Sequence, residues 1–201
     1  MNNSSIEIAK RHTAKSIDVK SMLLADEGAM QTIAQVADLC VEAYQHGRKV
    51  LWAGNGGSAA DAQHMAGEMV SKFQFDRPAL SSIALTTDTS IITAISNDMD
   101  YSDIFARQLQ AHALTGDVFV GISTSGNSKN LVKALPVCRE LGVISVALVG
   151  ASPCKMDDYD IVIKIPSTST PRIQECQTLI GHIICSIVEE RIFGEKYNKK
   201  E

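Results

Sequence analysis

The sequence predicts an α/β fold, a doubly wound, five-stranded parallel sheet with helices on both faces. Strand-like and helix-like segments alternate from residue 48 onward. The strand-like segments are continuous apolar runs, as expected for strands that are buried on both faces. With 201 residues, of which 45% are hydrophobic, the chain is long enough to bury one core of this kind.

Two helical patterns precede the first strand. In the first pattern a few apolar residues lie among polar ones: Ile6, Ile17, Met22, Leu23 and Leu24. The second has a clear apolar stripe at helical spacing, and Gly47 is its candidate C-cap: Ile33, Val36, Ala37, Cys40 and Ala43. Because a helix outside an α/β core needs a packing partner, we expect residues 1–47 to serve oligomerisation, as part of the same domain as residues 48–201.

The remaining elements follow in chain order. Strands are expected at 49–54, 81–85, 117–123, 144–150 and 160–165. Helices are expected up to about Phe73, in two runs through Ala113, up to Leu141, and from Pro171 onward. The last helix has a sharp start, because Ser169 or Thr170 can act as its N-cap and proline is favoured at the first helical position.

Two polar loops follow the first and third strands, with the sequences "GNGGS" and "STSGNS". In a flavodoxin-like strand order, 2-1-3-4-5, these loops face each other at the switch point where ligands bind. Glycine, serine and threonine before a helix N-terminus are typical of a phosphate site, although one such loop can also be an ordinary capped turn.

The first loop also matches a dinucleotide-binding pattern through Gly54, Gly56 and Ala59. The acidic residue that would hold a ribose, about 20 residues further on, is missing, since the nearest acid after the second strand is Asp88. The sequence also lacks a Walker A motif. A small phosphorylated ligand is therefore favoured over a nucleotide cofactor.

Ionisable residues lie on the helices near these loops. His64 and Glu68 are four residues apart and so share one helix face, although a surface glutamate paired with Lys72 is the simpler alternative. On the closing helix, His182 lies in an apolar run, where a histidine is more often a core residue. Gln174, eight residues earlier, lies about 80° away around the helix, so both residues can border one pocket.

Composition excludes several classes of partner. The net charge of −4 leaves no broad basic surface, so nucleic-acid binding is not expected. No segment resembles a signal peptide or is apolar for the length of a membrane span. The five cysteines contain no C-x-x-C pair and are interpreted as reduced, mostly buried thiols of a cytoplasmic protein.

Four separated segments resemble the phosphoheptose isomerases, the sedoheptulose 7-phosphate isomerase branch of the sugar isomerase (SIS) domain proteins: "GNGGSAADAQHMAGE", "AISND", "GDVFVGISTSGNSKNLVKA" and "RIQECQTLIGH". The resemblance covers nearly the whole chain and makes residues 48–201 a SIS sugar-phosphate isomerase domain. It implies a cytoplasmic homotetramer whose active sites lie between subunits, with the N-terminal helices packed there.

The resemblance also implies the site residues. Substrate would bind to Asn55, Gly56, Gly57, Glu68, Asn97, Asp98, Ser123, Thr124, Ser125, Ser128 and Gln174. One zinc ion per subunit would be held by His64, Glu68, Gln174 and His182. The implied reaction converts sedoheptulose 7-phosphate to D-glycero-D-manno-heptose 7-phosphate through an enediol(ate), for lipopolysaccharide or capsule synthesis, with Glu68 as the base and His182 as the acid.

A non-catalytic SIS protein that associates with a replication initiator is the alternative function. Such relatives resemble the isomerases less at the end of the last helix. His182, retained in "QECQTLIGH", and the unsubstituted "GNGGS" loop favour the enzyme.

Overall fold

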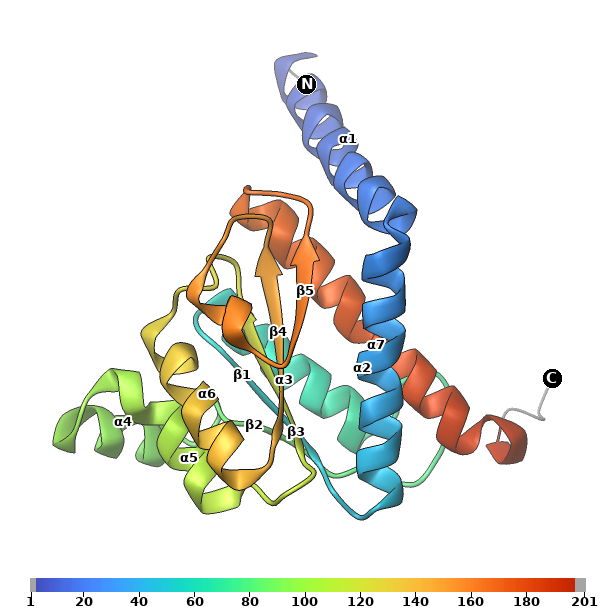
Figure 1. Cartoon of the computed structure of the whole chain (residues 1–201). Coiled ribbons are helices and arrows are strands. Elements are labelled where there is room, and N and C mark those ends of the chain that lie inside the picture. The colour runs from blue at the N-terminus through green and yellow to red at the C-terminus, as the bar shows by residue number, and fades with distance from the viewer. Residues whose placement is uncertain (1–2, 198–201) are drawn as a thin grey trace.

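The computed structural model describes residues 3–197, which form a three-layered α/β fold (Figure 1). The helices are α1 (Asn3–Ala25), α2 (Glu27–Gln45), α3 (Gly57–Val70), α4 (Thr89–Asp98), α5 (Ile104–His112), α6 (Lys129–Leu141) and α7 (Thr170–Tyr197). The strands are β1 (Val50–Gly54), β2 (Ser82–Ala84), β3 (Val118–Ser123), β4 (Ile144–Gly150) and β5 (Ile161–Ile165). Two short 3₁₀ turns, η1 (Tyr101–Asp103) and η2 (Lys155–Asp158), complete the order.

All five strands are parallel, and their order is β2-β1-β3-β4-β5. This order confirms the prediction from the sequence. Since β1 pairs directly with β3, with Leu51 opposite Phe119, the carboxyl ends of these strands lie side by side. The two polar loops therefore start next to each other, at the point where the strand order reverses.

Each face of the sheet has its own hydrophobic core. Alternate strand residues such as Trp52 and Val120 pack under α2, α3 and α7, whereas Leu51 and Phe119 pack under α5 and α6. In Figure 1, α2 and α7 lie behind one face, and α4, α5 and α6 lie together on the other side of the sheet. The continuous apolar strands are explained by this double coverage.

Both ends of α2 are capped by residues next to the helix. Asp26 caps its N-terminus by accepting a hydrogen bond from the backbone N–H of Ala29. At its C-terminus Gly47 has φ of 68°, and Arg48 N–H donates to the carbonyl of Ala43. This is a Schellman motif, for which glycine is strongly preferred.

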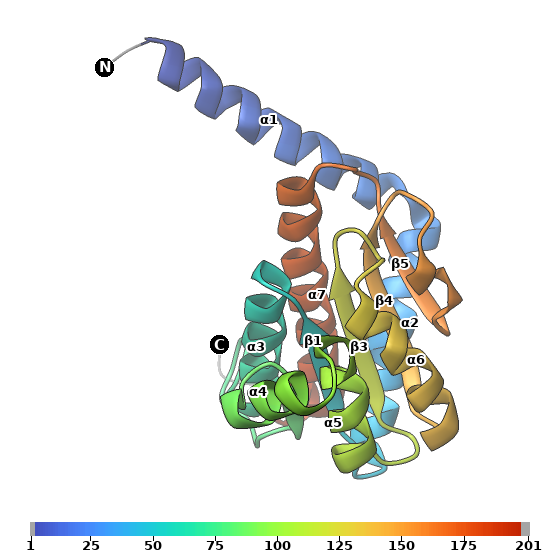
Figure 2. The ribbon, with the colours of Figure 1, turned by 90° about the vertical axis from the view of Figure 1, so that its left-hand side faces the viewer.

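The first helix projects away from the rest of the molecule (Figure 2). Only its C-terminal part contributes to the core, through Val19 and Leu23. Its other apolar side chains remain in solvent, with Ile17 58% and Leu24 70% exposed. A hydrogen bond from Ser16 to Glu175 ties it to the start of α7. The helix is thus fixed at one end and presents apolar side chains that this chain does not cover.

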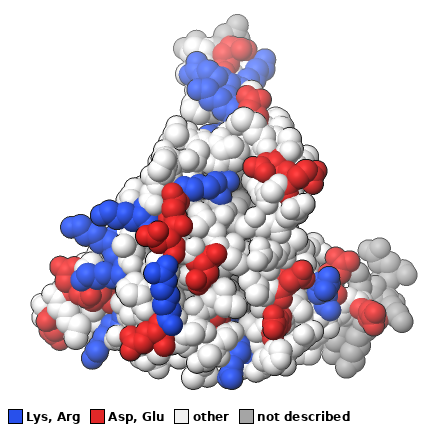
Figure 3. All heavy atoms as spheres, viewed as in Figure 1, with Lys and Arg blue, Asp and Glu red and all other residues white. Residues whose placement is uncertain are grey.

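The surface charges and the cysteines are arranged as the composition indicates. On the face shown in Figure 3, basic and acidic side chains are mixed rather than segregated. No helix in the described part of the chain has the length and apolarity needed to cross a membrane. All five cysteines are free thiols, and Cys154 is the one that is not fully buried.

Gly126 in the second loop offers a test of the fold. It has φ of 62°, and a Cβ added there would lie 2.2 Å from Sγ of Cys154. Gly126→Ala is expected to destabilise the protein by about 1–3 kcal/mol, from backbone strain and overlap together. The free energy of unfolding in urea measures this. Gly67→Ala is the matched control, because a Cβ at this exposed helical position meets nothing and should be neutral or stabilising. Equal effects at both positions would contradict the assignment.

Candidate active site

The first loop turns tightly from β1 into α3. A Cβ on Gly54 would lie 2.5 Å from the backbone oxygen of Ser58, so only glycine allows the chain to fold back this closely. Gly56 has φ of 56° and occupies the N-cap position, where it offers no capping side chain. The backbone of Asn55, Gly56 and Gly57 therefore lies at the carboxyl end of β1 and at the start of α3.

Asn55 is held by a network of amide hydrogen bonds. Its Nδ2 donates to Oδ1 of Asn130 at 3.0 Å, and Nδ2 of Asn130 donates back to its Oδ1 at 2.8 Å. The hydroxyl of Tyr101 donates to the same Oδ1 at 2.8 Å. This reciprocal pair joins the first loop to α6. The three residues, together with Asp100 and Ser128, line a cavity of about 380 Å³.

The second loop is shaped by its own hydroxyl groups. Oγ of Ser123 accepts a hydrogen bond from Gly126 N–H and lies 3.1 Å from Oγ of Ser128. Ser128 is the N-cap residue of α6, yet its side chain makes no capping bond. The hydroxyls of Ser123 and Ser128 thus lie together at the open N-terminus of α6, an arrangement suited to an anion.

The outer side of the second loop lines a polar cavity of about 290 Å³. Thr124 and Ser125 face it from the loop, and the ends of β4 and β5 and the start of α7 close it: Gly150, Ser152, Ser167, Thr168 and Thr170. The loop thus borders a hollow rich in hydroxyl groups. These can bind either phosphate or sugar hydroxyls.

The residues in and next to η2 pack against the second loop. Met156 N–H donates to the carbonyl of Gly126. The Lys164 ammonium lowers the pKa of Asp157 to about 2, and Asp157 accepts from the backbone N–H of Cys154. Burial, with the neighbouring Asp157, raises the pKa of the Cys154 thiol. Cys154 therefore stays protonated near neutral pH and acts as packing under the loop.

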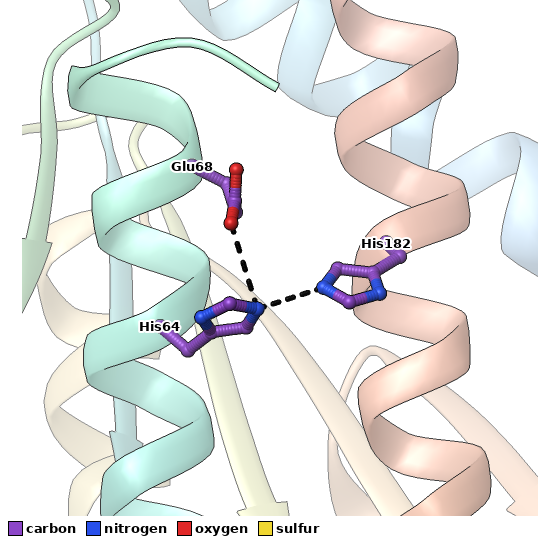
Figure 4. A group of neighbouring side chains, drawn as sticks. All are labelled: His64, Glu68 and His182. Atoms are coloured by element: carbon purple, nitrogen blue, oxygen red, sulfur yellow. Dashed lines mark hydrogen bonds and ion pairs between the residues drawn. The ribbon is translucent and has the colours of Figure 1, made fainter. Parts of the chain in front are cut away.

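Three ionisable side chains meet between α3 and α7 (Figure 4). Nε2 of His64 lies 2.8 Å from Nε2 of His182 and 3.5 Å from Oε1 of Glu68. One ligand atom from each of the three lies within 4.8 Å of the other two. His64 is exposed, and the other two are half-buried, so a small molecule can reach all three. The prediction that His64 and Glu68 share one helix face is confirmed.

Packing of α3 on α7 brings these side chains together. The two helices run in the same direction, so successive turns match: Gly57 with Gln174, Asp61 with Thr178, and His64 with His182. The helices approach closely at Gly181, where a Cβ would lie 2.3 Å from Sδ of Met65. His182 thus faces α3 rather than the apolar core, and its catalytic role stays a prediction.

Gln174 lies at the first loop. A Cβ on Gly57 would lie 2.7 Å from Nε2 of Gln174, so the amide packs directly against the loop backbone. Gln174 precedes His182 by about 12 Å along the helix axis, at 1.5 Å per residue. The structure therefore places Gln174 beside the first loop, and its role as a fourth metal ligand stays a prediction.

Asn97 and Asp98 occupy the last turn of α4. Both are exposed, and Nδ2 of Asn97 donates to Oδ1 of Asp98 at 2.8 Å. The residues that follow them, Asp100 and Tyr101, line the cavity beside Asn55 instead. Their binding of substrate also stays a prediction.

Several residues near the site were not singled out from the sequence. Asn130 and Tyr101 hold Asn55, and Thr178 donates to Asp61 at 2.8 Å between α3 and α7. Asn130 is the second residue of α6, just after the second loop, so its position at a helix start is a signal that the sequence carries. Phe73, whose ring centroid lies 5.3 Å from that of His182, carries no such signal.

Comparison with known proteins gives consistent matches. The family model of the SIS domain matches residues 12–150. A protein named phosphoheptose isomerase from Aneurinibacillus thermoaerophilus is 59% identical over 189 residues, covering 94% of this chain and 96% of its own. Phosphoheptose isomerase 2 from Campylobacter jejuni is 58% identical, with 96% of each chain covered.

Solved structures give the same result. A phosphoheptose isomerase from Francisella tularensis superimposes with a TM-score of 0.87 at 34% identity, over 94% of this chain and 100% of its own. One from Neisseria gonorrhoeae gives a TM-score of 0.84 at 38% identity, over 92% and 98%.

Proposed function

Because the chain belongs to the phosphoheptose isomerases of the SIS domain family, we propose that Glu68 and His182 are its acid–base pair. The protein is an aldose–ketose isomerase that converts sedoheptulose 7-phosphate to D-glycero-D-manno-heptose 7-phosphate for heptose biosynthesis. The matched relatives carry the isomerase name, and they give no support to a non-catalytic binding protein.

One observation carries the assignment of the pair. Glu68 and His182 come from helices that are far apart in the sequence, yet their polar atoms and those of His64 lie within 4.8 Å of one another. A carboxylate and an imidazole at this separation can reach neighbouring atoms of one small substrate.

The reaction moves protons between C1, C2 and their oxygens. Glu68 takes the proton from C1 of the open-chain ketose, and the electron pair forms the C1–C2 double bond of an enediol(ate) as O2 gains a proton. His182 supplies the proton to O2 and accepts the proton from O1 as the C1 carbonyl forms. A proton delivered to C2 then completes the aldose.

The two loops position the rest of the substrate. We assign the phosphate to the hydroxyls of Ser123, Thr124, Ser125 and Ser128, and the first loop to the sugar chain. Two observations support this assignment. No side chain caps the N-terminus of α6, and the hydroxyls of Ser123 and Ser128 lie 3.1 Å apart there. Binding the phosphate end holds C1 and C2 in place, which saves the entropy of orienting them during reaction.

A zinc ion fits the cluster chemically. Two imidazoles and one carboxylate are the donors of many catalytic zinc sites, which keep a further position open. His64, Glu68 and His182 would hold the ion, and Gln174, which packs against the first loop, would have to move toward them to become the fourth ligand. When bound, such an ion polarises a carbonyl and stabilises developing negative charge.

The assembly belongs to the same proposal. The apolar side chains of α1 that this chain leaves exposed support packing against further copies, as a homotetramer with active sites between subunits: Ile6, Ile8, Ile17, Met22 and Leu24. Five free thiols support a reducing, cytoplasmic location.

Substitution of the acid–base pair tests the mechanism. Glu68→Gln and His182→Ala are each expected to lower kcat by about 10²–10⁴-fold, the range of general acid–base catalysis. Conversion of sedoheptulose 7-phosphate is followed by NMR, with melting temperatures as a check on folding. Glu190→Gln, an exposed glutamate on α7, is the control and should keep the wild-type rate. Near-wild-type kcat in either variant would show that the pair is wrongly assigned.

Metal uptake tests the ligand set. After treatment with a chelator, the protein is expected to bind one Zn²⁺ per chain, measured by elemental analysis and calorimetry. His64→Ala should weaken binding by at least about a hundredfold, because a direct ligand matters more than the outer partners whose loss costs 10–100-fold. His112→Ala, at the exposed end of α5, should have no effect. Wild-type affinity in His64→Ala would remove zinc from the cluster.

Light scattering tests the assembly. The expected mass is that of about four chains of 21.7 kDa each. Ile17→Glu with Leu24→Glu should produce smaller species, because charges then occupy an apolar contact. Leu114→Glu places the same charge on another exposed apolar residue and should leave the mass unchanged. A monomeric wild type, or an unaltered mass in the α1 variant, would contradict the proposal.

A further inference from the structure

A buried ion pair lies just beyond the proposed catalytic residues. Nε of Arg77 donates to Oε1 of Glu189 at 2.9 Å, and both side chains are only 1% exposed. Arg77 lies in the connection from α3 to β2, and Glu189 lies on α7. A fully buried pair is weak evidence for stability, since desolvation offsets most of its attraction. Both members of the pair also hold backbone groups of α3 and of the segment that follows it.

The Arg77 side chain caps the C-terminus of α3, the helix that carries Glu68. Its Nη2 donates to the carbonyl of Glu68 at 2.8 Å, and its Nη1 donates to the carbonyl of Met69 at 2.7 Å. These carbonyls belong to the last turn of α3, where backbone acceptors lack a partner within the helix. A cation at this end is also favoured by the helix dipole. The guanidinium thus fixes the backbone from which the Glu68 side chain extends.

Glu189 holds the segment that follows α3. Its Oε1 accepts a hydrogen bond from Phe73 N–H at 2.9 Å, and its Oε2 accepts one from Gln74 N–H at 2.7 Å. Both carboxylate oxygens are therefore engaged, and the backbone at Phe73 is anchored to α7 two turns beyond His182.

The anchored phenylalanine lies against His182. The ring centroids of Phe73 and His182 are 5.3 Å apart, with an angle of 34° between the ring planes, and the ring centroid of His64 lies 5.0 Å from that of His182. The His182 ring therefore contacts two other rings. The backbone position of one of them, Phe73, is set by Glu189.

We infer that Glu189 is a positioning residue of the isomerase, which sets His182 through Phe73 and sets Glu68 through Arg77. The inference rests on the proposed acid–base pair. The Glu189 carboxylate thereby links residues 71–81, which follow α3, to both Glu68 and His182. It lies at the C-terminal end of the α3–α7 contact. Misplacing a reacting group by about 1 Å can cost 10²-fold in rate.

Kinetics of Phe73→Leu are the main test, because this variant removes the ring and leaves the Arg77–Glu189 pair intact. We expect kcat to fall about tenfold while KM changes less than about twofold, since the phosphate loops are untouched. Phe75→Leu is the matched control, a half-buried phenylalanine in the same segment, and should keep the wild-type kcat. Equal kcat values in the two variants, or a parallel rise in KM, would overturn the inference.

A second variant tests the role of the carboxylate. Glu189→Gln is expected to lower kcat with little change in KM, and the double variant with Phe73→Leu should lose less than the product of the single losses, because both act through one contact. Multiplicative losses would overturn the link. If Glu189→Gln does not fold, Glu189→Asp takes its place, because it keeps the charge opposite Arg77 but shortens the reach to Phe73 N–H and should also lower kcat.

A spectroscopic measurement separates this inference from the catalytic assignment. The ring-proton shifts of His182, recorded by NMR on chelator-treated protein, should move in Phe73→Leu and stay unchanged in Phe75→Leu, since an adjacent aromatic ring shifts nearby protons. This result stands even if the wild type does not turn over sedoheptulose 7-phosphate, which would refute the proposed function. Unchanged shifts in Phe73→Leu would refute the positioning role.

Discussion

The packing of α3 on α7 is the contact on which the proposed site depends. The two helices run in the same direction and approach closely where Gly181 meets Met65. Because both have the same rise per residue, each turn of one faces a fixed turn of the other. The first loop, the histidine pair and the Arg77–Glu189 ion pair lie at successive turns along this one contact. A side chain larger than that of Gly181 would separate all of them together.

The sheet supplies the other half of the site. Pairing of β1 with β3 places the two polar loops beside each other, and the reciprocal amides of Asn55 and Asn130 join the first loop to the first turn of α6. These two hydrogen bonds pair uncharged groups, so they hold the first loop against α6 without adding charge where an anion would bind. The sheet thus positions the proposed binding groups, and the α3–α7 contact positions the proposed catalytic ones.

The sequence predicts the periodic and local features well. The strands, the apolar stripe of α2 and the glycine at its end follow from patterns within a few residues of one another, whereas the strand order is expected from the flavodoxin-like fold. The grouping of His64 with Glu68 is local too, whereas the arrival of His182 depends on how α7 packs. Its apolar neighbours allowed a core interpretation, and the resemblance to the isomerases was needed to favour the site.

The supporting residues could not be predicted in this way. Glu189 and Glu190 are adjacent and identical in type, yet one is buried against Arg77 and the other is exposed. Arg77 is 112 residues away along the chain, and no local pattern relates the two. Likewise, α1 has Leu23 in the core and Leu24 in solvent, a distinction that only the docking of its last turns decides.

The missing cap of α6 links ligand occupancy to the stability of the protein itself. Ser128 stands where a serine would normally satisfy the first amide groups of the helix, but its hydroxyl is engaged with Ser123 instead. Leaving such a cap unmade costs about 1 kcal/mol. A phosphate bound there would take over the capping role, so the folded state would gain stability in proportion to the logarithm of the sugar-phosphate concentration. The substrate would then complete the secondary structure of the enzyme that converts it.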